Sequence, residues 1–202
     1  MSSRDNILNA VKAAQPESIP LPGELPLKVA GEGDVATFKK VLETIGGRVE
    51  FISGIGDALP VIQRLFPEAK RIVSSSTSIE QYLYKEDKNV RHHTLHDVDV
   101  VIMEAPLGVA ENSAVWVTEE DAKIRVLPFI GEHLVVIIPA SSIVPTMHHA
   151  YEVIGENGYG FGVFIAGPSK TADIEQSLVL GAHGPKSMTV LIINDSDYLP
   201  SP

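Results

Sequence analysis

The sequence feature that most restricts the fold is an unbroken apolar run, Val135-Val136-Ile137-Ile138. A strand that is apolar on both faces is typical of a parallel sheet that helices cover on both sides. Six further β-rich runs are bounded by turn residues, at residues 48–52, 71–74, 98–103, 114–118, 162–165 and 188–193. Helical patterns lie between several of them, at residues 58–66, 78–84, 144–154 and 172–180. This alternation predicts a three-layer α/β/α fold with a mostly parallel sheet, partly mixed around residues 105–126, where no helical pattern is found.

The N-terminal part is predicted to be a helix followed by an arm. Ser2 and Asp5 stand three residues apart, which is the spacing of a capping box that begins a helix. Residues 15–33 contain four prolines and three glycines, a composition that interrupts regular structure. A chain of 202 residues fills one hydrophobic core well. We therefore expect a single domain over residues 1–202, in which residues 1–33 are an N-terminal helix and a Pro/Gly-rich arm.

The absence of cysteine removes several kinds of chemistry. The chain has no thiol nucleophile, and no thiolate ligands for zinc or for an iron–sulfur cluster. Its formal net charge of −10 argues against a nucleic-acid partner, which requires a basic face. The longest apolar run is far shorter than the ~20 residues of a membrane-spanning helix, and the N-terminus is polar, unlike a signal sequence. We therefore expect a cytoplasmic protein with no membrane partner and no cofactor of its own.

A loop after the β-rich run at residues 162–165 is the first candidate site. It precedes the helix predicted at residues 172–180, and a helix N-terminus presents free backbone N–H groups to an anion. A lysine in the loop adds a full positive charge, which favours a phosphate or carboxylate ligand. The alternative is that the loop only caps the helix and complements its dipole. The candidate ligand-binding residues are Gly167, Ser169, Lys170, Thr171 and Asp173.

A second loop, between a β-rich run and a helical pattern, consists entirely of hydroxyl residues. These are Ser74, Ser75, Ser76, Thr77 and Ser78. In open α/β sheets ligands collect beyond the carboxyl ends of the strands, so this loop is expected to share one anion cleft with the lysine loop. The alternative is a solvated turn that caps a helix.

Two further residues are candidates for catalysis. Glu111 lies in a loop between β-like runs, where a carboxylate can act as a base or as a nucleophile towards a thioester; the alternative is a surface glutamate in a turn. His183 lies in a turn just beyond the predicted helix, and it either lines the cleft or complements the helix C-terminus. The other clustered histidines, His92, His93 and His96, stand in an acidic connection, and we predict no metal site there.

The motif that contains the lysine loop resembles the C-terminal signature of the LUD-domain family. Residues 167–175 read Gly-Pro-Ser-Lys-Thr-Ala-Asp-Ile-Glu, and residues 180–185 read Leu-Gly-Ala-His-Gly-Pro. The family typically has Gly-Pro-Ser-Arg/Lys-Thr-Ala-Asp-Ile-Glu and then Leu-Gly-x-His-Gly-Pro. Residues 108–111 are similar to its Ala-Glu/Asp-Thr-Gly loop, although Asn112-Ser113 replaces the usual Thr-Gly. Lys170 stands where arginine is common, which keeps the charge and loses bidentate geometry.

The resemblance implies the fold of ribose-5-phosphate isomerases, glucosamine-6-phosphate deaminases and CoA-transferases. It also implies a role in the oxidation of L-lactate to pyruvate beside partner subunits that carry iron–sulfur clusters. This leads to a subunit that binds a small carboxylate or phosphate, with the redox centre in its partners. Two alternatives stay open: an independent enzyme in which Glu111 attacks an acyl-CoA or the cleft isomerises a sugar phosphate, and a scaffold with no active cleft.

Overall fold

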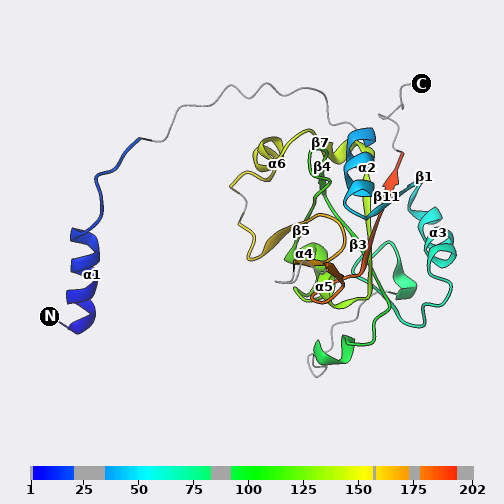
Figure 1. Ribbon diagram of the computed structural model, residues 1–202, viewed down its shortest axis with the longest axis horizontal. Helices are drawn as coiled ribbons and strands as arrows, with labels where there is room; N and C mark the ends of the chain where they lie inside the picture. Colours follow the sequence, from blue (N-terminus) through cyan, green and yellow to red (C-terminus); the bar gives the residue numbers. More distant parts are fainter. Residues whose placement is uncertain (1, 21–34, 83–91, 157, 173–177, 195–202) are drawn as a thin grey trace.

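The computed structural model describes residues 2–20, 35–82, 92–156, 158–172 and 178–194, and its centre is a five-stranded parallel sheet (Figure 1). The strand order is β1-β11-β6-β3-β2, and every neighbouring pair is parallel. The strands are β1 (Arg48–Ile52), β2 (Ile72–Ser74), β3 (Val100–Glu104), β6 (His133–Pro139) and β11 (Ser187–Ile193). The predicted α/β fold with a mostly parallel sheet is therefore confirmed.

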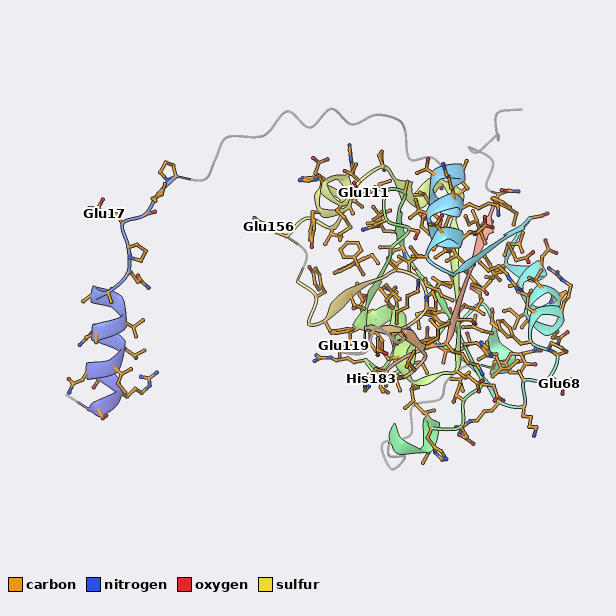
Figure 2. The ribbon with its side chains drawn as sticks, in the orientation of Figure 1. Glu17, Glu68, Glu111, Glu119, Glu156 and His183 are labelled. Carbon is orange, nitrogen blue, oxygen red and sulfur yellow. The ribbon has the colours of Figure 1, made fainter. Side chains whose placement is uncertain are left out.

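Helices on both faces of this sheet divide the core into two clusters. Helix α2 (Val35–Thr44) buries Val35, Phe38 and Leu42, whose spacing of three and four residues places them on one helix face. They pack with one set of strand side chains, and α3 (Ala58–Leu65) packs with the set that points the other way. Such a division follows from the alternation of side chains along a strand. Side chains fill the space around the sheet (Figure 2).

A second, four-stranded sheet packs beside the first, in the order β7-β4-β5-β8. Its strands are β4 (Leu107–Val109), β5 (Val115–Thr118), β7 (Ile143–Val144) and β8 (Gly162–Ile165). The β4–β7 pair is parallel and the other two pairs are antiparallel, so the mixed pairing expected around residues 105–126 is confirmed. Helix α6 (Met147–Ile154) packs on this sheet through Ala150 and Ile154, around the buried Trp116.

The short helical elements differ from the prediction in several places. The sequence pattern missed α4 (Glu119–Ala122) and α5 (Leu127–Ile130). A helix was expected at residues 144–154, but residues 143–144 belong to β7 and α6 begins only after Pro145. A helix was also expected at residues 78–84. Within this range the structure has only a 3₁₀ turn, η2 (Glu80–Tyr82), among the described residues, and residues 83 and 84 lie outside them. The remaining 3₁₀ turns are η1 (Ile55–Asp57), η3 (His92–Leu95) and η4 (Ala140–Ser142).

The helix predicted at residues 172–180 is wrong. Its ends form strands β9 (Lys170–Ala172) and β10 (Leu178–Leu180), which pair antiparallel, and residues 173–177 lie outside the described residues. The β-branched Thr171 and Val179 face each other in this hairpin, as strand preferences favour. The residues that flank the two strands are also hydrogen-bonded, since Gly181 N donates to Ser169 O at 3.1 Å. Pairing between the two strands has therefore overridden the local helical pattern.

Helix α1 (Ser3–Ala13) begins with the predicted capping box. The Ser2 hydroxyl accepts the Asp5 N–H, and the Asp5 carboxylate accepts the Ser2 N–H at 2.9 Å. None of the residues of α1 is buried. Among the described residues, no helix is both long and apolar enough to cross a membrane.

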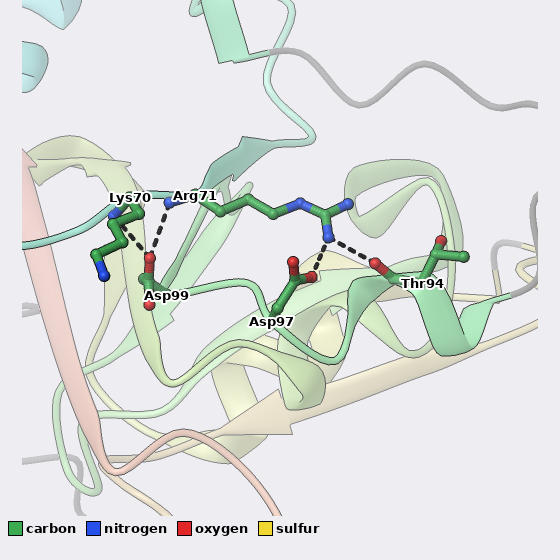
Figure 3. Close-up of polar contacts among 5 residues, drawn as sticks. All are labelled: Lys70, Arg71, Thr94, Asp97 and Asp99. Carbon is green, nitrogen blue, oxygen red and sulfur yellow. Dashed lines mark hydrogen bonds and ion pairs between the residues drawn. The ribbon is translucent and has the colours of Figure 1, made fainter.

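Asp99 connects the starts of three strands at the amino edge of the main sheet (Figure 3). One carboxylate oxygen accepts the backbone N–H groups of Lys70 and Arg71, at 2.7 and 2.8 Å. The backbone carbonyl of Asp99 accepts the N–H of His133, the first residue of β6, at 2.8 Å. Hydrogen bonds from Arg71 and Lys70 lower the pKa of Asp99.

We expect Asp99→Ala to lower the free energy of unfolding by about 1–3 kcal/mol, because two backbone donors lose a charged acceptor. The folded-state pKa is lowered, so this contribution is fully present above the unfolded pKa, near ~4, and disappears as the pH falls through the folded value. Urea unfolding at pH 7 and in acid measures both effects. Asp97→Ala is the control, since its exposed ion pair with Arg71 contributes only about 0–1 kcal/mol. Equal losses for the two variants at pH 7 would contradict the role of Asp99.

Candidate functional site

The best-supported candidate site lies at the carboxyl edge of the main sheet, where parallel strands place their loops together. Ser74 ends β2, and Ser75 and Ser76 follow it. All three serines are buried, with exposed fractions of 0%, 2% and 5%, which is unusual for a polar loop. Thr77 and Ser78 are exposed. The first three residues of the loop are thus part of the folded interior, and the last two are at the surface.

Hydroxyl groups hold the serine loop in shape. Ser76 N–H donates to Ser74 Oγ at 3.0 Å, and Ser78 N–H donates to Ser76 Oγ at 3.1 Å. The Ser76 hydroxyl itself donates to the carboxylate of Glu104, the last residue of β3. Glu104 was not among the predicted site residues, although its position as a charged residue at the end of an apolar β-rich run is a signal in the sequence.

The hydroxyl of Ser75 has no hydrogen-bond partner among the described residues. Its backbone N–H is satisfied, since it donates to Ile102 O at 2.9 Å. A buried hydroxyl without a partner costs about 1–3 kcal/mol, so such groups in folded proteins usually meet a ligand or an ordered water.

A cavity of about 270 Å³ adjoins Glu104 at this edge. Besides Glu104 of β3, it is lined by two other parallel strands, through Ile137 and Pro139 of β6 and Ile193 of β11, and by Asp121 of α4. The volume suits a small organic molecule. Two carboxylates in its wall disfavour a bare anion and favour a ligand that offers a hydroxyl donor.

The lysine loop and His183 lie at the other edge of the sheet, so the predicted common anion cleft is wrong. Ser169 N–H donates to Pro185 O at 2.8 Å, just before β11 begins. His183 lines a separate cavity of about 700 Å³ together with residues that precede β2, β3 and β6, among them Lys70, Asp99 and Glu132. Segments that precede parallel strands gather at the amino edge and segments that follow them gather at the carboxyl edge, which separates the two loops.

The signature residues of the lysine loop build a packed turn. Gly167 has φ +72°, and a Cβ there would lie 2.8 Å from Ile45 Cδ1. Gly181 has φ +77°, and a Cβ there would lie 2.7 Å from Lys186 Cβ. Both positions therefore require glycine for backbone conformation and for space. Lys170 and His183 are exposed, and Asp173 lies outside the described residues.

Glu111 caps helix α6 from a distant part of the chain. It follows β4, and its Oε1 accepts the N–H of Met147, the first residue of α6, at 2.7 Å. Ser113, where the family has glycine, has φ +56°, so this position does adopt the conformation that glycine prefers. Figure 2 shows Glu111 and His183 at opposite ends of the part of the molecule that contains the sheets. The two predicted catalytic residues therefore do not share a site.

The histidines do not assemble a metal site in the described part of the chain, where no group of three or more metal-binding side chains is found. The side chains of His92 and His93 are outside the described set, and His96 lines the same cavity as His183. His133, which the sequence analysis missed, is half-buried at the amino edge. Burial lowers its pKa, and its Nδ1 lies 2.6 Å from Ser187 Oγ.

Comparison with known proteins gives one family and one similar fold. The LUD domain family matches residues 79–193. Lactate utilization protein C of Anoxybacillus flavithermus is 39% identical over 90 residues, covering 44% of this chain and 41% of that protein. Proteins of the same name from Halalkalibacterium halodurans and Bacillus subtilis are 30% identical over 131 residues and 32% identical over 117 residues, covering 58% and 55% of this chain. The matched segments span only 57% and 48% of those two relatives.

The crystal structure of a DUF162 family protein from Deinococcus radiodurans superimposes with a TM-score of 0.61. The match covers 79% of this chain and 96% of that protein at 15% sequence identity, and it shows a shared fold.

We expect Glu111→Ala to lower the free energy of unfolding by about 0.5–2 kcal/mol, the range measured for lost helix caps. Glu111→Gln should lose less, because the amide oxygen still accepts the Met147 N–H. Urea denaturation monitored by circular dichroism measures both. The control is Glu152→Ala, an exposed glutamate within the same helix. Full stability in Glu111→Ala would show that the carboxylate does not cap α6.

Proposed function

Because this chain belongs to the LUD-domain family, we propose that it acts in lactate utilisation, as a subunit of a system that oxidises L-lactate to pyruvate with iron–sulfur partner proteins. The name shared by its relatives from three bacterial genera supports the pathway. The oxidation removes two electrons and two protons from the substrate, so it needs an electron acceptor. A chain without cysteine offers no thiolates for an iron–sulfur cluster. In this proposal the partners carry the electrons.

The carboxyl-edge cavity is the ligand site in this proposal, and the observation that carries it is the hydrogen bond from the buried Ser76 hydroxyl to the exposed carboxylate of Glu104, which lines the cavity. A serine hydroxyl that donates to one lone pair of Glu104 leaves the carboxylate able to accept a second hydroxyl. A small hydroxy acid provides that donor, and the cavity of about 270 Å³ has room for it. Its own carboxylate would point away from Glu104 and Asp121, because like charges repel.

The position of Glu111 gives no support to the alternative of thioester chemistry. One of its oxygens is occupied by the Met147 N–H, and the buried Ser113 stands where a glycine would leave space for close approach. We expect no covalent adduct at Glu111 after incubation with acetyl-CoA, measured by mass spectrometry of the intact protein.

The ligand site is tested with L-lactate and propionate, which has the same carbon chain and no hydroxyl. We expect L-lactate to shift amide resonances of residues 74–78 and propionate to leave them unchanged. Glu104→Ala should weaken L-lactate binding about tenfold, the equivalent of about 1.4 kcal/mol for a hydrogen bond to a charged group. Glu68→Ala, at an exposed position of the other edge, is the matched control. Equal shifts with propionate would contradict the role of Glu104.

The pathway is tested separately by reconstitution. A mixture of this chain and its iron–sulfur partners should reduce an electron acceptor with L-lactate, and omission of this chain should abolish the reaction. An undiminished rate without it would contradict the proposed subunit role.

A further inference from the structure

Helix α1 presents an apolar face that nothing in the described chain covers. Ile7, Leu8 and Val11 are exposed by 62%, 50% and 57%, and their spacing places them on one side of the helix. Arg4 lies three residues before Ile7 and therefore joins the same side. An isolated helix of 11 residues is only marginally stable in water, so a face of this kind is typical of a helix that docks.

A groove on the second sheet has the complementary character. We call it the Trp116 groove; it has a volume of about 440 Å³, and its walls include Leu107, Trp116, Val153 and Tyr159. Val153 and Tyr159 are exposed by 62% and 43%, although both are apolar or aromatic. The floor is formed by packed aromatic rings, because Trp116 contacts the rings of Tyr159 and Phe164 at centroid distances of 5.2 and 4.6 Å.

The charges of the two surfaces also match. Glu119 and Glu120 line the groove; Glu119 already forms an ion pair with Arg125, which leaves Glu120 as the carboxylate of the rim that can meet a cation. The whole helix α1 carries Arg4 and Lys12 against a single acidic residue. That residue, Asp5, is occupied by the capping box, which lowers its pKa. The helix is thus a cationic amphipathic element in a chain of net charge −10, and the groove is apolar with an acidic rim.

We propose that α1 of one chain docks in the Trp116 groove of a second copy, so that two chains exchange their N-terminal helices. Each copy contributes its helix α1 and its Trp116 groove. In a closed dimer with two-fold symmetry both α1 helices are therefore docked and both grooves are filled. The 21 residues between α1 and α2 can span up to about 70 Å at ~3.3 Å per residue, so they permit the exchange.

Disulfide trapping tests the contact directly, because the chain has no native cysteine. Full-length Leu8→Cys and full-length Val153→Cys are mixed under mild oxidation and analysed on a non-reducing gel. We expect a mixed disulfide dimer to dominate. The control partner is Phe51→Cys, which places a thiol on another exposed apolar residue, 44% exposed, outside the groove. Equal trapping with both partners, or no mixed dimer, would overturn the proposal.

A double variant with both Leu8→Cys and Val153→Cys distinguishes two arrangements: α1 docked in the groove of a second copy, and α1 docked in the groove of its own chain. Exchange predicts disulfide-linked dimers, and a monomer with an internal disulfide would overturn it. Sedimentation equilibrium of unmodified protein should show a dimer whose dissociation constant rises at least tenfold in Leu8→Asp and in Val153→Asp, with no change in Phe51→Asp. A protein that stays monomeric up to ~1 mM, or that dimerises equally in all variants, would also overturn the proposal.

Discussion

The pairing of β6 with β11 is the interaction around which the rest of the molecule is arranged. The two strands share seven register pairs, and in each strand five consecutive residues are buried. Neighbouring residues such as Val136 and Ile137, whose side chains point to opposite faces, can both be buried only if other elements cover both sides, which α2 and α3 do. The outer strands β1, β3 and β2 extend the sheet on either side of these two buried strands.

This parallel arrangement also sorts the loops by chemistry. The carboxyl ends of the strands and the loops after them carry the buried serines and Glu104. The amino ends of the strands and the segments before them carry Asp99, His133 and the turn with His183. The carboxylate and the carbonyl of Asp99 link the starts of β2, β3 and β6, so this residue stabilises the amino edge of the sheet. The carboxyl edge keeps a cavity and an unsatisfied hydroxyl, which is why we assign the ligand there.

Two groups that the sequence marks as chemical turn out to have structural partners. The glycines of the family signature close a turn against Ile45 and Lys186, and Glu111 caps a helix that begins 36 residues later. The residues of a family signature can therefore be required for a backbone conformation as well as for a reaction. The apolar side chains of α1 and the exposed Val153 of the Trp116 groove are the opposite case, since they are open to solvent.

The sequence by itself determined the α/β class, the capping box of α1 and the strands that carry a β-rich run, because apolar periodicity and cap spacing are local properties. The short strands β4 and β7 were not predicted, and the residues of β10 were predicted to be helical. The runs at residues 48–52 and 162–165 coincide with β1 and β8. Only the tertiary structure decided the strand order, in which β11, the last strand along the chain, lies beside β1, the first. The residues after Lys170 form a hairpin in place of the expected helix, because the two strands pair with each other and Ser169 N–H donates to Pro185 O beside them. The strand order separated the serine loop from His183, and this outcome depends on contacts between segments far apart in sequence, which no local pattern records.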